Sequence, residues 1–274
     1  MSVVLQQRDT QNEAVLILTM NRPEAMNSFN IEVCHALVDA IKAADKDPSV
    51  RAIVVTGAGR AFCAGADISQ GFVAVEAEIV DEATGITRDW GGYLNLTIFQ
   101  CDTPILAAIN GAAVGIGATM TVPMDMRIAS HRSKFGFPFA RRGIVCDGAA
   151  SWFLPRLVGF ARAQEWILTA RIIMADEMLA AGFVTQLHDP EDVLPRTLEI
   201  ARDIAVNCSP ASIADNKRLV RASMLGSATY ESGPYKAHLA ESDLLNKAFV
   251  SADCKEGVTA FFEKRAPKFS DREQ

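Results

Sequence analysis

Two short aliphatic runs on either side of an amphipathic segment constrain the fold of this chain more than any other feature. Residues 14–20 read AVLILTM and residues 50–57 read VRAIVVTG, as expected for strands buried on both faces. Between them, apolar residues recur at helical spacing from Ile31 to Asp45, after Asn30 as a helix cap. Strand, helix and strand over this length predict a right-handed crossover unit. The chain is therefore expected to be an α/β protein.

The stretch from Pro104 to Met124 contains no charged residue and could be mistaken for a membrane span. It also holds three glycines within seven residues, an Asn-Gly turn signal and a proline near its end, which disfavour a spanning helix. We therefore predict a buried strand at 105–110, a turn and a tightly packed helix start. Two further strands are predicted at 126–130 and 134–137.

The last part of the chain is predicted to be helical. Ser209-Pro210 is a typical helix start, with the serine as cap and the proline in the first turn. Asp253 followed by Glu256 resembles a capping box before another helix. Apolar residues between 239 and 249 mark a third helix.

We divide the chain into a core of residues 1–200 and a helical region of residues 201–274. The helices of the second part have apolar faces that are suited to docking on the core or on a neighbouring subunit. No internal repeat or low-complexity segment interrupts either part.

The overall charge argues against nucleic-acid binding as the main function. The 274 residues carry a net charge of −6 and have a pI near 5.3, whereas binding to a phosphate backbone needs a concentrated basic surface.

The six cysteines are widely spaced, with no C-x-x-C pair and no histidine placed to complete a zinc site. The N-terminus lacks the basic start and apolar block of a secretory signal. We expect a cytoplasmic protein without a membrane segment or a metal.

Six blocks of sequence, taken in order, resemble the crotonase superfamily, which contains the enoyl-CoA hydratases and isomerases. The first three are MNRPEAMNSFN, AIVVTGAGRAFCAGADI and PILAAINGAAVGIGATMTVPMDMRIAS, which begin at Met20, Ala52 and Pro104. The last three are FARRGIVCDGAASWFLPRLVG, ADEMLAAGFV and FFEKRAPKF, which begin at Phe139, Ala175 and Phe261. The resemblance covers nearly the whole chain and depends on the order and spacing of all six blocks.

This resemblance implies a spiral of strand–strand–helix turns, followed by a C-terminal α-helical region that builds homotrimers, often stacked as hexamers. It also implies that the substrate is an acyl-CoA thioester. Coenzyme A would then enter as part of the substrate, and no separate cofactor is expected. In such proteins the coenzyme lies across the A-G-A-D loop.

The resemblance further implies that two backbone N–H groups hold the thioester oxygen. Carried over by motif, they belong to Ala64 in A-G-A-D and to Ile116 in the V-G-I-G turn. The nearby Gly65, Gly115 and Gly117 allow the backbone to approach a ligand without an intervening Cβ. The Ile116 amide also opens a helix, where an unpaired N–H favours negative charge. The role requires that neither N–H is bonded within the fold.

The two glutamates with which hydratases of this family activate water are replaced here by Thr119 and Phe139. Neither side chain is a general base near neutral pH, so hydration by the usual pair is disfavoured. One carboxylate remains, Asp147, in a block that resembles the Δ3,Δ2-enoyl-CoA isomerases, whose glutamate moves a proton from C2 to C4. Apolar neighbours are expected to raise the pKa of Asp147 toward neutrality. We therefore favour an isomerase with Asp147 as the proton shuttle.

Other roles for Asp147 stay open. Its position also resembles the nucleophilic aspartate of 4-chlorobenzoyl-CoA dehalogenases, and an aspartate before Gly-Ala-Ala-Ser could instead cap a helix. Hydratase or hydrolase chemistry, with water placed by other groups, is a further alternative. A catalytically silent acyl-CoA-binding oligomer is the alternative of another class.

Six other residues are implied to contact coenzyme A: Ala25, Ala66, Asp67, Ile68, Phe261 and Lys264. Ala25, Ala66 and Ile68 match positions whose backbone meets the coenzyme in the family. Asp67 is expected to order the A-G-A-D loop and to help seat the adenine. Lys264 could reach a phosphate, including from a neighbouring subunit, and Phe261 could lie beside the ligand. For both, a solvated charge or a core aromatic residue is the alternative.

Overall fold

The computed structural model describes residues 2–67, 80–225 and 251–271, which form two sheets surrounded by helices. In spatial order, the six strands of the larger sheet are β1 (Val4–Arg8), β2 (Val15–Met20), β3 (Ala52–Gly57), β5 (Ile105–Ile109), β7 (Met126–Ser130) and β10 (Gln186–His188). The four strands of the smaller sheet are β4 (Ala61–Cys63), β6 (Ala112–Val114), β8 (Lys134–Gly136) and β9 (Ile172–Met174). Only β1 and β9 run antiparallel to their neighbours.

The helices lie around these sheets, and α3, α6 and α7 each follow a strand directly in the chain. In chain order they are α1 (Ile31–Lys46), α2 (Trp90–Gln100), α3 (Ile116–Thr119), α4 (Ala150–Val158), α5 (Phe160–Thr169), α6 (Ala175–Ala180), α7 (Val193–Asn207), α8 (Pro210–Leu225) and α10 (Ala252–Glu263). The described residues also form two 3-10 helices, η1 (Pro23–Ala25) and η2 (Ala140–Arg142).

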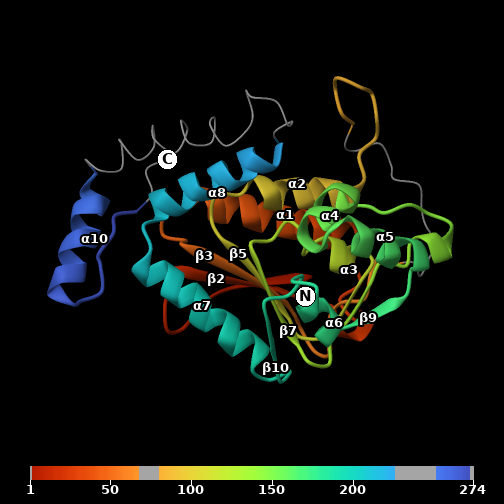
Figure 1. Cartoon of the computed structure of the whole chain (residues 1–274), viewed down its shortest axis with the longest axis horizontal. Helices are drawn as coiled ribbons and strands as arrows, with labels where there is room; N and C mark the ends of the chain where they lie inside the picture. The colour runs from red at the N-terminus through yellow and green to blue at the C-terminus, as the bar shows by residue number, and fades with distance from the viewer. Residues whose placement is uncertain (1, 68–79, 226–250, 272–274) are drawn as a thin grey trace.

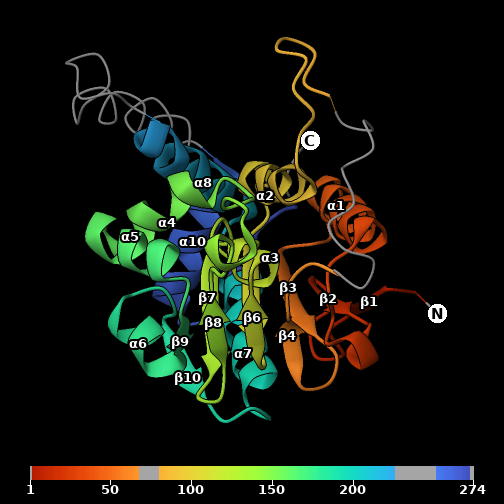
Figure 2. The same cartoon turned by 90° about the vertical axis from the view of Figure 1, so that its right-hand side faces the viewer.

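From β3 to β8, successive strands alternate between the two sheets. The larger sheet pairs β3 with β5 and β5 with β7, while the strands that follow each of them, β4, β6 and β8, pair in the same order in the smaller sheet. Helix α2 lies between the first and second strand pairs, and α3 between the second and third. Figure 2 shows the two sheets side by side. This arrangement confirms the predicted spiral of strand–strand–helix turns.

The larger sheet is covered on both faces, which explains why its strands read as continuous apolar runs. In β3, Ile53 and Val55 belong to the main core with α1, whereas Ala52 and Val54 pack in a second cluster with α7. Figure 1 shows α7 on one side of this sheet and α1 and α2 on the other. Side chains alternate along a strand, so neither set can avoid burial.

The strands and the first helix predicted from the sequence are confirmed. Strand β2 precedes α1 in the chain and β3 follows it, and the two strands are parallel neighbours in the sheet. The Asn30 side chain caps α1 by accepting the Val33 N–H at 2.9 Å. The uncharged stretch forms β5, β6 and the short α3. Within the described part of the chain, no helix is both long enough and apolar enough to cross a membrane.

The C-terminal helices agree with the sequence only in part. Helix α7 packs its buried face on the larger sheet, so the boundary predicted at residue 200 falls inside a helix of the core. Helix α8 begins as predicted, because the Ser209 hydroxyl accepts the Ser212 N–H at 3.3 Å. The predicted helix over 239–249 lies outside the described residues. Assembly into trimers or hexamers stays a prediction.

The capping box predicted before α10 is wrong. The Ser251 hydroxyl caps this helix by accepting the Cys254 N–H at 3.0 Å. Asp253 instead accepts a hydrogen bond from the Ser209 hydroxyl and so joins α10 to the start of α8. A serine two residues earlier competes for the same cap, and tertiary contacts decide which side chain takes it.

Candidate active site

The loops that follow β4 and β6 touch at the centre of the candidate site. Gly65 has a φ of +118°, and a Cβ there would lie 3.2 Å from the Val114 carbonyl oxygen. A Cβ on Gly115 would lie 3.8 Å from the Gly65 Cα. Gly117 packs closest, since a Cβ there would lie 2.0 Å from the Cys63 carbonyl oxygen. Glycine therefore allows the close backbone approach that the sequence predicts.

The Ala66 N–H is directed away from the segment that holds its loop. The Gly65 carbonyl oxygen accepts the Phe29 N–H at 2.8 Å, and the Asp67 N–H donates to the Phe29 carbonyl oxygen at 2.8 Å. A trans peptide holds its C=O and N–H in opposite directions, so the Ala66 N–H must point away from Phe29. Among the described residues, none accepts a backbone hydrogen bond from it. It is an open donor.

The N–H of Ala64 is used within the fold. It donates to the Met26 carbonyl oxygen at 3.1 Å, so it is not available to a ligand. The prediction that Ala64 supplies one of the two donors is therefore wrong, and Ala66 has the open N–H instead. The sequence could not separate the two alanines because both adjoin Gly65.

The Ile116 N–H is the second open donor. The Gly115 carbonyl oxygen accepts the N–H groups of Ala118 and Thr119, each at 2.9 Å, and so points into α3. The N–H of the same peptide, which belongs to Ile116, must point out of the helix start. It has no backbone acceptor in the part of the chain that the structure describes. This geometry is what the predicted role of Ile116 requires.

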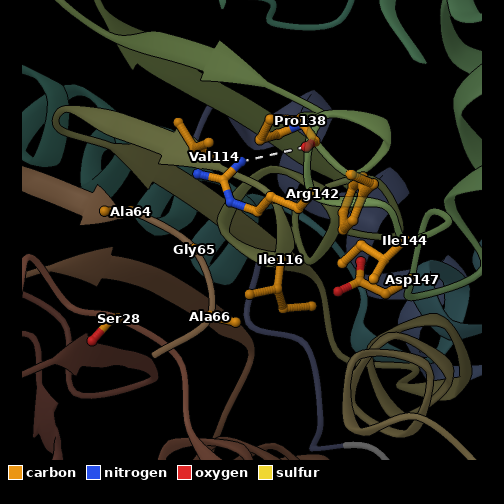
Figure 3. A pocket seen from close by; sticks show the side chains of 12 residues that line it. Ser28, Ala64, Gly65, Ala66, Val114, Ile116, Pro138, Arg142, Ile144 and Asp147 are labelled. Atoms are coloured by element: carbon orange, nitrogen blue, oxygen red, sulfur yellow. Dashed lines mark hydrogen bonds between the residues drawn. The ribbon is translucent and has the colours of Figure 1, made fainter. Parts of the chain in front are cut away.

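A cavity of about 210 Å³ is lined by Ala66 and Ile116 and by the segment from Pro138 to Asp147. Figure 3 shows Asp147 and Ile144 on one side of it and the A-G-A-D loop on the other. Of the described residues that line the cavity, only Arg142 and Asp147 are charged, and most of the others are apolar. One carboxylate beside open N–H groups suits a reaction that moves a proton while negative charge develops on an oxygen.

Asp147 has the raised pKa that the sequence predicts. Burial raises its pKa from 3.8 to about 6; the Thr119 hydroxyl opposes this rise, and the negative charge of Asp89 adds to it. The Thr119 hydroxyl donates to Asp147 Oδ1 at 2.6 Å, which fixes one carboxylate oxygen. Helix α4 starts after Ala149 without a side-chain cap. The interpretation of Asp147 as a helix cap is therefore wrong.

The other polar or reactive groups near Asp147 are poor candidates for the chemistry. The two hydratase glutamate positions hold no acid, because Thr119 and Phe139 occupy them. Thr119 is fully buried, and Phe139 forms part of the cavity wall. Burial raises the pKa of the Cys63 thiol to about 12, which keeps it protonated and unreactive. In the residues that the structure describes, no three metal-ligating side chains gather into one group.

The residues predicted to contact coenzyme A near this loop lie together. The Arg22 guanidinium forms an ion pair with Asp67 at 2.8 Å, which ties the loop to the segment before η1. Ala25 ends η1, next to the carbonyl group that holds Ala64. Contact of Ala25, Ala66 and Asp67 with the coenzyme stays a prediction. Ile68 lies outside the described residues.

Two residues predicted to contact the coenzyme are far from the cavity of the same chain. Lys264 follows α10 and is exposed, and Figure 1 shows α10 at the opposite end of the molecule from α3. The backbone of Phe261 lies in α10, but its side chain is outside the described part. A contact by either residue would have to reach the cavity of a neighbouring subunit.

Helix α2 lies behind Asp147 and supplies two contacts that the sequence analysis missed. Its capping residue Asp89 accepts the Gly148 N–H at 3.2 Å, and Asn95 donates to the Gly148 carbonyl oxygen at 2.7 Å. The available signal was Asp89 before Trp90-Gly91-Gly92, a helix start. Nothing in the sequence connects that helix start with a residue so far along the chain.

Comparisons with known proteins show the family of the chain. A family model described as "Enoyl-CoA hydratase/isomerase" matches residues 10–272. The enoyl-CoA hydratase ACTT3 of Alternaria alternata is 40% identical over 260 residues, which cover 94% of this chain and 84% of the relative. The 1,2-epoxyphenylacetyl-CoA isomerase of Escherichia coli is 31% identical over 261 residues, which cover 95% and 96%. A probable enoyl-CoA hydratase/isomerase from Mycobacterium abscessus has a crystal structure that matches with a TM-score of 0.85 at 32% identity, covering 98% of this chain and 100% of that chain.

Proposed function

Because the chain belongs to the enoyl-CoA hydratase/isomerase family, we propose that this acyl-CoA enzyme shifts a double bond in an enoyl-CoA, with Asp147 as the proton carrier. One observation supports the choice of isomerisation. Asp147 is the only acid among the described residues that line the cavity. A double-bond shift needs one group that takes a proton from one carbon and returns it to another.

The proposed reaction conserves all atoms and electrons. The Asp147 carboxylate removes a proton from C2 of a 3-enoyl-CoA, and the C–H electrons form a dienolate whose negative charge rests on the thioester oxygen. Protonated Asp147 then returns the proton to C4, which leaves the double bond between C2 and C3. The reaction is redox-neutral, so we propose no cofactor beyond the coenzyme A of the substrate.

The N–H groups of Ala66 and Ile116 are proposed to hold the thioester oxygen. Both are open donors on touching loops, and both residues line the cavity. Charge on that oxygen grows in the dienolate, so hydrogen bonds to it strengthen during the reaction, and each donor contributes about 3 kcal/mol. In this arrangement the coenzyme passes along the A-G-A-D loop, beside Ala25 and Asp67.

A pKa of about 6 for Asp147 suits this cycle. At neutral pH the group is mostly the carboxylate that the first step needs, and its conjugate acid is strong enough to return the proton in the second. The value of kcat/KM should therefore rise with pH, with a midpoint of about 6, and then level off. A carboxyl with its usual pKa would place that rise well below pH 5.

The first prediction concerns Asp147 itself. Asp147→Ala and Asp147→Asn should each lower kcat/KM for 3-enoyl-CoA isomerisation by about 100-fold or more, because no other acid among the described residues lines the cavity to move the proton. The rate is measured by conversion of 3-enoyl-CoA substrates of several chain lengths. Val145→Ala is the matched control, since Val145 lies in the same loop and is 86% exposed. Wild-type rates in the Asp147 variants would remove Asp147 from the mechanism.

Hydration of a 2-enoyl-CoA is the second candidate, favoured by the names of the relatives, several of which are enoyl-CoA hydratases. Asp147 would then activate a water in place of the missing pair. Mass spectrometry of the products separates the candidates, because isomerisation keeps the mass and hydration adds one water. Tight binding of an acyl-CoA panel without any new product would instead support a silent acyl-CoA binder.

A further inference from the structure

Helix α2 holds the backbone on either side of Gly148. The Gly148 N–H, which belongs to the peptide that joins it to Asp147, donates to Asp89 Oδ1 at 3.2 Å. The Gly148 carbonyl oxygen, in the following peptide, accepts from the Asn95 side-chain amide at 2.7 Å. Two successive peptides of the turn that carries Asp147 are thus bonded to one helix.

The turn adopts a backbone that needs such support. Gly148 has a φ of +63°, and a Cβ there would lie 2.5 Å from the Asn95 amide nitrogen. The next residue, Ala149, has a φ of +54°, a left-handed conformation that costs an alanine on the order of 1 kcal/mol. Conformations of this kind persist where surrounding contacts impose them. The contacts from Asp89 and Asn95 impose this conformation on the Gly148 turn.

Asn95 also bonds to the element on the other side of Asp147. Its side-chain amide donates to the Thr119 carbonyl oxygen at 2.9 Å, while the Thr119 hydroxyl donates to Asp147 Oδ1. Asn95 is completely buried, and its Oδ1 has no hydrogen-bond partner among the described residues. A buried amide with an unpaired oxygen is unfavourable for stability alone. The two bonds that the Asn95 amide nitrogen donates join the Gly148 turn to α3.

We infer that Asp89 and Asn95 are positioning residues for the proton transfer, and that they aim the Asp147 carboxylate by fixing the Gly148 turn against α2 and α3. The inference rests on the proposed role of Asp147. Neither Asp89 nor Asn95 lines the cavity, so both act through the turn and not by touching the substrate.

Asp89 also contributes charge beside Asp147. Both lie against Gly91, where a Cβ would be 3.1 Å from Asp89 Oδ1 and 3.3 Å from Asp147 Cγ. Among the described residues, the Cys63 and Cys146 thiols also lie near Asp147, and burial raises their pKa values to about 12 and about 11, so both stay neutral. Arg142 lies on the same cavity wall. Removing the negative charge of Asp89 should therefore make Asp147 ionise at lower pH.

The second prediction tests Asp89 through this charge. Asp89→Asn keeps an oxygen for the Gly148 N–H but removes the charge. The midpoint of the pH dependence of kcat/KM should fall by about half a pH unit or more. The 13C shift of the Asp147 carboxyl carbon, followed by NMR in the free enzyme, should show the same fall. Asp192→Asn is the control, because Asp192 precedes α7 as Asp89 precedes α2. Its midpoint should not move.

Asn95 is tested by its effect on turnover. Asn95→Ala removes the side-chain bonds to the Gly148 and Thr119 carbonyls and so unties the Gly148 turn from α3, so kcat should fall about 10-fold or more while KM changes much less. Asn95→Ser is the milder variant for the case in which the alanine variant does not fold, and it should fall between wild type and alanine. Wild-type kcat in a folded Asn95 variant would overturn its positioning role.

The two proposals fail separately. An unmoved carboxyl titration in Asp89→Asn would overturn the action of the Asp89 charge on Asp147, whatever reaction the enzyme catalyses. Wild-type isomerisation by Asp147→Ala would instead overturn the proposed function, while the NMR titration would still report whether α2 acts on Asp147.

Discussion

At the scale of single residues, backbone contacts decide which positions tolerate a side chain. Gly117 opens α3 directly against β4, and an added Cβ would lie 2.0 Å from the Cys63 carbonyl oxygen and 2.8 Å from its carbon. Neither backbone atom can move without shifting the A-G-A-D loop. Gly257 contrasts with it, because it lies inside α10 and, among the described residues, a Cβ there would meet only Phe269 ring carbons at 3.6 Å.

The third prediction compares these two glycines. Gly117→Ala should destabilise the protein by at least about 2 kcal/mol, because the overpacked methyl group forces the two loops apart, and should also impair isomerisation. Gly257→Ala should leave activity intact and stabilise the protein by up to about 1 kcal/mol, since alanine favours a helix interior. Urea unfolding and the isomerase assay measure the two effects. Equal stability of both variants would contradict the close approach of α3 and β4.

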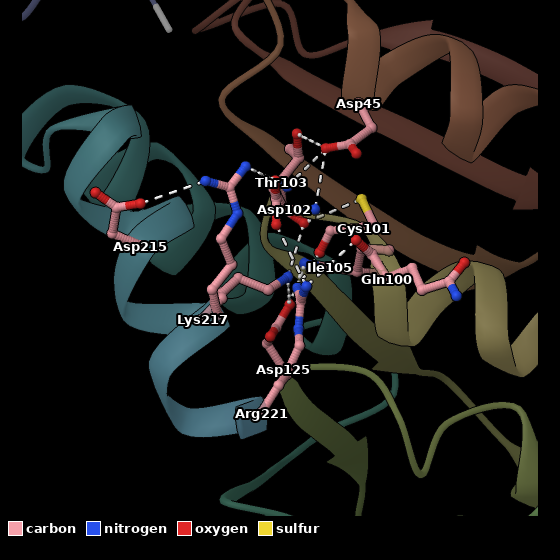
Figure 4. Close-up of polar contacts among 11 residues, drawn as sticks. Asp45, Gln100, Cys101, Asp102, Thr103, Ile105, Asp125, Asp215, Lys217 and Arg221 are labelled. Atoms are coloured by element: carbon pink, nitrogen blue, oxygen red, sulfur yellow. Dashed lines mark hydrogen bonds and ion pairs between the residues drawn. The ribbon is translucent and has the colours of Figure 1, made fainter. Parts of the chain in front are cut away.

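At the scale of elements, charged contacts hold α8 against the end of the larger sheet. The Lys217 ammonium donates to Asp125 Oδ2 at 2.6 Å and to the Thr103 carbonyl oxygen at 2.9 Å. The same carboxylate accepts the Ile105 N–H at 2.7 Å, so it links α8 to β5. Figure 4 shows Lys217 and Arg221 of this helix reaching into one polar cluster. The sequence predicted docking through apolar faces, and this polar anchor could not be found from helical periodicity.

The fourth prediction concerns that anchor. Lys217→Met should lower the free energy of unfolding by about 1–3 kcal/mol, because it leaves the Asp125 carboxylate without its cation in a site where the Lys217 side chain is only 13% exposed. Arg196→Met is the control, since its ion pair with Glu199 joins side chains that are 53% and 56% exposed. That change should cost less than about 0.5 kcal/mol. Comparable losses in the two variants would show that Lys217 is an ordinary surface charge.

At the scale of the whole molecule, the acid at the centre of the site opposes folding. Burial raises the pKa of Asp147 from 3.8 to about 6, so the folded state holds this proton more tightly than the unfolded state. Both states are protonated well below pH 3.8, and the group then has no effect on stability. As the pH rises from 3.8 through 6, the unfolded chain ionises first and the folded protein loses stability.

The fifth prediction follows from this linkage. Asp147→Asn keeps an acceptor for the Thr119 hydroxyl but cannot ionise, so it should be more stable than the wild type at neutral pH. Its advantage should grow by about 2 kcal/mol between pH 4 and pH 7. Urea unfolding at several pH values measures the difference, with the exposed Asp189→Asn as a control that should stay flat. A constant difference across this range would contradict the buried setting of Asp147.

The sequence by itself determined the order of the elements and the neighbourhood of the site. Strands such as Ile105–Ile109 and the helix after Asn30 follow from local patterns of apolar residues and caps, which act over a few positions. The six family blocks likewise identified the two glycine-bearing loops and Asp147. These features depend on residues that are close together in the chain.

Only the tertiary structure decided which atoms face the cavity. Pairing of the A-G-A-D loop with Phe29 turns the Ala66 N–H outward, while Ala64 bonds to Met26. Likewise, Asp89 and Asn95 meet Gly148 only after α2 has packed behind its turn. The direction of a peptide group and the partner of a buried amide depend on contacts between distant segments, which no local pattern of residues specifies.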